Sequence, residues 1–81
     1  MELRFTRSAT KHRISHGRSA HVIEHYRAVG LVAATATEPE RFVFVGDDAG
    51  GVALEVIAIP LAVDGLLVIH AMRLRPKYSH I

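Results

Sequence analysis

Residues 52–78 read VALEVIAIPLAVDGLLVIHAMRLRPKY, and this stretch decides the fold because it holds the clearest local structure signal in the chain. Two apolar runs rich in Val, Ile and Leu flank Asp64-Gly65. Asp-Gly supplies the two residues with positive φ that a type I′ hairpin turn needs. The stretch therefore predicts an antiparallel hairpin.

The predicted hairpin has two largely apolar faces. With Asp64 and Gly65 as the central turn residues, Ile57 lies opposite Met72 and Ile59 lies opposite His70. Alternation then gives Ile57, Ile59, Leu61, Val68, His70 and Met72 on one face and Val56, Ala58, Pro60, Ile69, Ala71 and Arg73 on the other. Strands that are apolar on both sides are usually covered on both sides, so we expect helix over one face and a partner or more chain over the other.

The N-terminal third predicts one strand and two helices. Leu3 and Phe5 alternate with polar residues over 2–6, which is typical of a short amphipathic strand. Ser8 is placed to cap a brief helix over 9–13, and Ser15 to cap a second helix over 16–28.

The middle of the chain returns to the sheet. Gly30 is a plausible stop for the second helix, and residues 31–37 fit either an extended connection or a helix tail. A turn at 38–40, a strand over 41–45 and a loop over 47–51 then lead into the hairpin. The prediction is a single α+β domain over 1–81 in the order β-α-α-β-β-β, an antiparallel sheet with two N-terminal helices packed on one face.

Size and composition limit the class of protein. A chain of 81 residues with 49% hydrophobic content can close one small core. The stability of a single copy with such a core is marginal, so we expect a homodimer. The chain has no cysteine, so disulfides and thiolate metal sites are excluded. Its start is charged and its longest apolar run is too short for a membrane span. We expect a soluble, cytoplasmic protein without a membrane partner.

Charge is unevenly distributed along the chain. Residues 1–27 hold six basic and two acidic side chains, a net +4. Residues 28–72 hold one basic and six acidic side chains, a net −5, and residues 73–81 carry a net +3. If the two basic ends meet in the fold, they form the kind of positive face that binds RNA. Scattered, solvated charge is the alternative.

Several stretches together resemble one protein family. SATKHRIS at 8–15, FVFVGDDAGG at 42–51, LEVIAI at 54–59 and LLVIHAMRLRPKY at 66–78 carry the resemblance. In this order the chain resembles small bacterial toxins of the BrnT-like branch of the RelE superfamily. One departure is that the chain stops at Ile81, before the C-terminal helix common in such toxins.

The resemblance implies a RelE-like fold and a ribonuclease that acts on RNA and is neutralised by a cognate antitoxin. Basic residues and a tyrosine or histidine near the last strand carry the chemistry of such toxins. On this chain the implied residues are Lys11, His12 and Arg13 before the helix, and His70, Arg73, Lys77 and Tyr78 at the end.

The same residues suit RNA cleavage on chemical grounds. Attack by a 2′-hydroxyl needs a base, an acid for the leaving 5′-oxygen and cations for the charge that develops on the phosphate. We take the catalytic set to be His70, Arg73, Tyr78 and His12, with Lys11, Arg13, Arg75 and Lys77 as RNA-binding residues and with no metal or cofactor. In the alternative reading His70 and Tyr78 are packing residues, and the basic tail protects a sheet edge from aggregation.

A second motif matches the sequence pattern of a metal site. His21-Val22-Ile23-Glu24-His25 matches H-x-x-E-H, in which two histidines one helical turn apart share a zinc ion. A catalytic zinc site needs a third protein ligand, and none is evident in this short chain. We interpret the motif as a solvent-facing histidine stripe.

Two functions therefore remain open. One is an RNase toxin that binds RNA with its basic face. The other is a non-catalytic homodimeric binding module of the same fold.

Overall fold

The computed structural model describes residues 1–81 and contains five strands, one α-helix and two short 3₁₀ turns. In chain order they are β1 (Glu2–Phe5), η1 (Arg7–Thr10), α1 (His16–Glu24), β2 (Ala28–Val32), β3 (Arg41–Asp47), β4 (Ala53–Pro60), β5 (Gly65–Arg73) and η2 (Pro76–Tyr78). The α+β class is confirmed. The predicted pair of helices is wrong, because only one α-helix forms.

All five strands belong to one sheet with the order β1-β5-β4-β3-β2. β1 pairs parallel with β5, and every other neighbouring pair is antiparallel. The prediction of a purely antiparallel sheet is therefore wrong at one edge. A parallel pair needs a long connection, and α1, β2, β3 and β4 supply it between β1 and β5.

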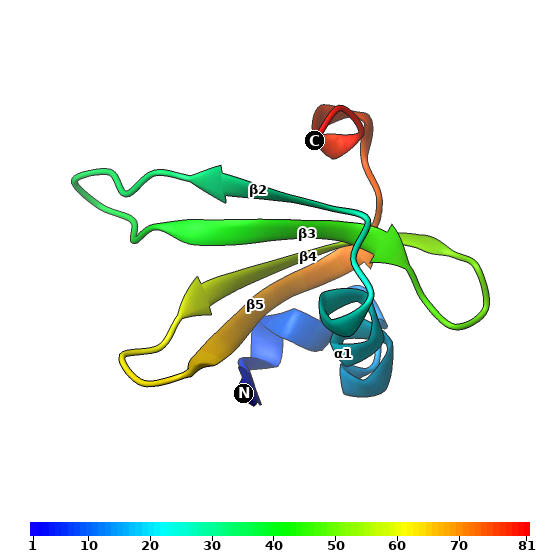
Figure 1. Ribbon diagram of the computed structural model, residues 1–81, viewed down its shortest axis with the longest axis horizontal. Coiled ribbons are helices and arrows are strands. Elements are labelled where there is room, and N and C mark those ends of the chain that lie inside the picture. Colours follow the sequence, from blue (N-terminus) through cyan, green and yellow to red (C-terminus); the bar gives the residue numbers. More distant parts are fainter.

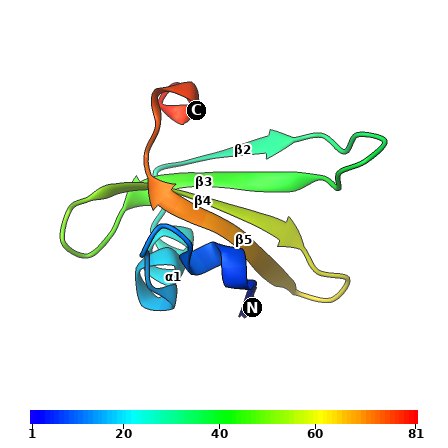
Figure 2. The same cartoon turned by 180° about the vertical axis from the view of Figure 1, so that it is seen from behind.

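The sheet has a different cover on each face. α1 and η1 lie on one face, whereas the C-terminal turn η2 stands over the other (Figures 1 and 2). The larger core lies under α1 and joins Val22 and Ile23 to Val56, Ala58 and Val68. On the other face a smaller cluster lies under η2, with Val43, Val45 and Ile57 buried. No helix in the structure is long and apolar enough to span a bilayer.

The brief helix predicted over 9–13 is replaced by η1. Ser8 does not cap a helix, because its hydroxyl donates to the Ile69 carbonyl oxygen at 2.8 Å. Thr6 likewise binds the sheet, through its amide and its hydroxyl to the Val68 carbonyl oxygen. These bonds hold residues 6–8 against β5, so the chain makes a single 3₁₀ turn.

The main helix begins as predicted and ends early. Ser15 caps α1 by accepting a hydrogen bond from the Arg18 amide at 3.2 Å. The helix ends at Glu24, and Gly30 lies inside β2 rather than terminating a helix. A β-carbon at Gly46 would lie 3.1 Å from Tyr26 Cα, so the chain crosses close over β3 before it enters the sheet edge. Residues 31–37, undecided from sequence, are strand to Val32 and loop beyond.

The central hairpin forms with a different turn and register. β4 ends at Pro60 and β5 begins at Gly65, so four residues connect them, and neither Asp64 nor Gly65 has positive φ. Gly65 is instead required by β1, because a β-carbon there would lie 2.9 Å from the Glu2 carbonyl oxygen. The prediction of a type I′ turn is wrong. Glycine is needed at position 65 because β1 approaches closely, and not because the backbone has positive φ there.

A β-bulge also divides the hairpin. Ile57 pairs with His70, but Ala58 pairs with Val68, so Ile69 is the extra residue of β5. The predicted pairs of Ile57 with Met72 and Ile59 with His70 are therefore wrong. The bulge moves Val68 to the α1 face and Ile69 to the η2 face, the reverse of the prediction.

Candidate functional site

Half of the cationic side chains in the chain have no carboxylate within ion-pair distance. Of ten Lys and Arg residues, five form ion pairs within 4.0 Å, namely Arg4, Arg18, Arg27, Arg41 and Arg75. The five without one are Arg7, Lys11, Arg13, Arg73 and Lys77. All five belong to the two basic segments that the sequence singled out.

His12 and His70 meet at the outer edge of β5. β1 pairs with residues 65–68, and η1 then continues along the same strand, so the chain reaches position 12 beside the second half of β5. The two imidazole rings lie 5.4 Å apart, centroid to centroid, in an edge-to-face arrangement. Two imidazoles, each able to donate or accept a hydrogen bond, thus share one site.

A fully buried carboxylate holds His70 from behind. Glu55 on β4 has no exposed surface, and its Oε2 lies 3.0 Å from His70 Nε2. Arg75 donates three hydrogen bonds to the same carboxylate, from its amide at 2.8 Å, its Nε at 2.9 Å and its Nη2 at 2.6 Å. Glu55 was not among the predicted site residues. Its signal was its place as the single charge in the apolar run 52–63, since an isolated acid in a buried strand needs partners.

The pKa values of this group favour a neutral imidazole beside a carboxylate. Burial opposes ionisation of Glu55, but the hydrogen bonds from Arg75 and His70 prevail and hold its pKa below the ordinary value. Burial lowers the pKa of His70, against the opposing effect of Glu55. Because the Glu55 carboxylate only accepts hydrogen bonds, Nε2 of His70 carries the proton and Nδ1 keeps a free lone pair.

A pocket of about 390 Å³ opens next to the histidine pair. Its lining residues are His12, Arg13, Ile14, Arg18, Met72 and Arg73. The structure thus brings His12, Arg13 and Arg73 together as expected. Arg18, which sequence reasoning left out, joins them because α1 begins beside this segment.

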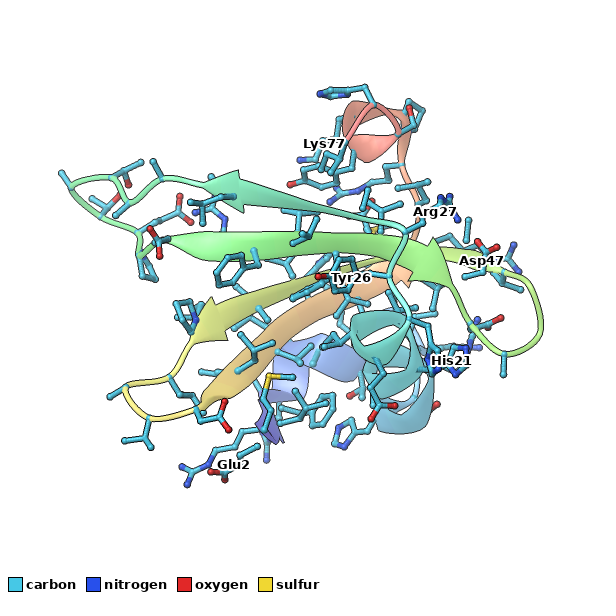
Figure 3. The ribbon with its side chains drawn as sticks, in the orientation of Figure 1. Glu2, His21, Tyr26, Arg27, Asp47 and Lys77 are labelled. Carbon is cyan, nitrogen blue, oxygen red and sulfur yellow. The ribbon has the colours of Figure 1, made fainter.

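The C-terminal residues lie elsewhere than expected. Tyr78 packs against the cluster on the η2 face, with Arg75 Cζ 5.6 Å and Lys77 Nζ 5.0 Å from its ring centroid. Lys77 stands across the sheet from α1 (Figure 3). Lys77 and Tyr78 do not line the pocket, because η2 lies across the sheet from α1 (Figure 1). Arg75, expected to bind RNA, is engaged with Glu55.

The histidine motif of α1 lies apart from this site. The rings of His21 and His25 stack with their centroids 4.3 Å apart, and neither histidine lines the pocket. No cluster of three or more His, Cys, Asp or Glu side chains suited to a metal ion is present. The pair alone does not complete a zinc site of the kind the motif suggests.

Comparisons of the chain with protein-family models, with curated proteins and with solved structures found no match.

Proposed function

We propose that this chain is an endoribonuclease toxin of a bacterial type II toxin–antitoxin pair, a RelE-like protein of the BrnT-like branch that cleaves RNA without a metal. The observation that carries the proposal is the His12–His70 pair, with His70 hydrogen-bonded to buried Glu55 and unpaired arginines alongside. Such a site supplies a base, an acid and cations at one place.

His70 serves as the base. Its lowered pKa keeps the ring neutral at physiological pH, and the bond from Nε2 to Glu55 fixes the tautomer that leaves Nδ1 free. Nδ1 accepts the proton of the 2′-hydroxyl as the 2′-oxygen forms its bond to phosphorus. Glu55 acts as a positioning residue, because it orients the imidazole and touches no substrate.

His12 in its protonated form serves as the acid. It gives its proton to the 5′-oxygen as the bond between phosphorus and that oxygen breaks. The products are a 2′,3′-cyclic phosphate and a 5′-hydroxyl, so atoms and protons balance without a further reactant. Arg73 stabilises the negative charge that builds on the oxygens of the scissile phosphate.

Induced expression in bacteria tests the toxin proposal. The wild type should arrest growth, and His70→Ala and Arg73→Ala should relieve the arrest while remaining folded by circular dichroism. His21→Ala is the matched control, since it removes a histidine that does not line the pocket and should leave toxicity unchanged. A harmless wild type that binds no RNA at low salt, where phosphate contacts are strongest, would contradict the proposal.

The exposed edge of β2 favours the second candidate, a homodimeric binding module. β2 reads Ala-Val-Gly-Leu-Val, with Val29 41% and Leu31 59% exposed and no charged residue. The opposite edge, β1, carries Glu2 and Arg4, which is how sheet edges usually avoid pairing. An uncharged apolar edge suits pairing with another strand, and this role is compatible with either function.

A further inference from the structure

We propose that the pocket lined by Arg13, Arg18 and Arg73 binds the RNA phosphate that neighbours the scissile one, with Arg13 as its principal ligand. The inference rests on the proposed function for the identity of the polyanion. His12 lines this pocket and also contacts His70. A strand with one phosphate in the pocket therefore has its next linkage beside the two histidines.

The backbone at Arg13 points to a selected side chain. Arg13 has φ of 64°, and it is the only residue other than glycine with positive φ. This region disfavours residues with a β-carbon and normally holds Gly, Asn or Asp. The position ends the turn after η1, where the Arg13 amide donates to the Thr10 carbonyl oxygen at 3.0 Å. Glycine would adopt this backbone conformation with less strain, so arginine at this position supplies a guanidinium at a cost in backbone strain.

The charges around the pocket suit a phosphate. Arg13 and Arg73 have no carboxylate partner, so their positive charge is not compensated. Arg18 is fixed by Asp48, whose Oδ2 accepts from Nε at 2.8 Å. Asp48 Oδ1 itself accepts hydrogen bonds from the Gly50 and Val52 amides at 2.9 and 2.8 Å. Only Nε of Arg18 donates to Asp48, so the terminal nitrogens of Arg18 have no hydrogen-bond partner. Several guanidiniums around one small pocket match the several oxygens of a phosphate.

Binding of an uncleavable RNA tests the site. We would measure fluorescence anisotropy with a labelled 2′-O-methyl oligonucleotide and with a DNA of the same sequence, at several salt concentrations. Arg13→Gly should weaken binding of both about tenfold and lower the salt slope by about 1, because a phosphate contact reads neither base nor sugar. Arg27→Ala is the control, since Arg27 is exposed, pairs with Asp47 and does not line the pocket.

Unfolding cannot explain such a loss, because glycine tolerates positive φ and Arg13→Gly should keep or raise the thermal midpoint. Unchanged binding by Arg13→Gly would overturn the site, as would a loss confined to RNA, or a wild type that binds neither oligonucleotide. A wild type that binds through Arg13 but cleaves nothing would remove the proposed function and leave the site. RNA cleavage by the wild type, together with unchanged RNA binding by Arg13→Gly, would support the proposed function and overturn the phosphate site.

Discussion

Glu55 is the residue on which both the stability of the sheet and the geometry of the histidine pair depend. A fully buried carboxylate is tolerated only when its oxygens are satisfied, and here His70 and Arg75 supply four contacts. Removing it leaves Arg75 without its anion and His70 without its tautomer partner. The residue therefore links a candidate catalytic group to the attachment of the C-terminal turn.

We expect Glu55→Ala to lower the free energy of unfolding by about 3 kcal/mol, as measured by urea denaturation. The matched control is Glu40→Ala, an exposed acid without an ion pair, which should change stability by less than about 0.5 kcal/mol. Similar effects of the two substitutions would show that the buried cluster contributes little.

Acid should destabilise the fold through the same cluster. His70 has a pKa below its ordinary 6.5 in the folded chain, so the unfolded chain binds the proton first as pH falls. The contribution of neutral His70 to the free energy of unfolding is therefore complete above pH 6.5, and it is lost as pH falls toward the pKa of His70 in the folded chain. Glu55 adds a second loss below its ordinary 4.5. Urea unfolding from pH 7 to pH 5 should show a steeper decline for the wild type than for His70→Gln, and equal slopes would refute the assignment.

At the scale of elements, the docking of β1 on β5 depends on Gly65. A β-carbon at this position would lie 2.9 Å from backbone of Glu2, which cannot move aside as a flexible side chain would. Gly65→Ala should therefore loosen β1 and reduce stability by about 1–3 kcal/mol, seen as faster hydrogen exchange over residues 2–6.

Gly17→Ala is the control for this substitution. Gly17 lies in α1 with open space around it, and alanine there should stabilise the helix by about 0.5–1 kcal/mol. A Gly65→Ala variant that is as stable as the wild type would mean that β1 is not packed against β5 in solution.

The elements also show how far sequence patterns reach. Alternation and capping predicted β1, the start of α1, β3 and the existence of the central hairpin. They could not give β2, because its five uncharged residues follow a helix directly and Gly30 resembles a helix stop. Nor could they give the bulge at Ile69, since an extra residue in one strand leaves no mark on a strand with apolar residues on both faces.

The edge strand β2 carries the prediction of a homodimer. Antiparallel pairing of two β2 strands about Gly30 would place Val29 of each copy opposite Leu31 of the other and cover both exposed side chains. We expect sedimentation at micromolar concentration to show a dimer for the wild type and a monomer for Leu31→Lys. A wild type that is monomeric there would contradict this prediction.

At the scale of the whole molecule, one small sheet separates two kinds of surface. The α1 face and the outer edge of β5 hold the pocket, the histidine pair and most of the unpaired cations. The other face is covered by the C-terminal turn. Arg75 attaches this turn to Glu55, and Ile81 packs over Gly30. The tail thus contacts Glu55, and through it His70, on the face that η2 covers.

This arrangement explains which site residues the sequence could and could not predict. The charge distribution left open whether the two basic ends meet, and the pairing of β1 with β5 brings segments 11–13 and 70–73 to one edge. The place of Tyr78 and Lys77 depends on which way the chain turns after β5, and local pattern does not fix that direction. Glu55 left a signal as the single charge in the apolar run 52–63, whereas Arg18 is recognised only when its partners on other elements are known.

The central claim is that His12 and His70 cleave RNA by transferring protons during attack of the 2′-hydroxyl. Mass spectrometry of the ends produced when purified protein acts on a defined RNA in excess chelator tests it most directly. The account predicts 2′,3′-cyclic phosphate and 5′-hydroxyl ends, lost in folded His12→Ala and His70→Ala variants. Ends bearing 3′-hydroxyl and 5′-phosphate groups, or cleavage that survives both substitutions, would contradict it.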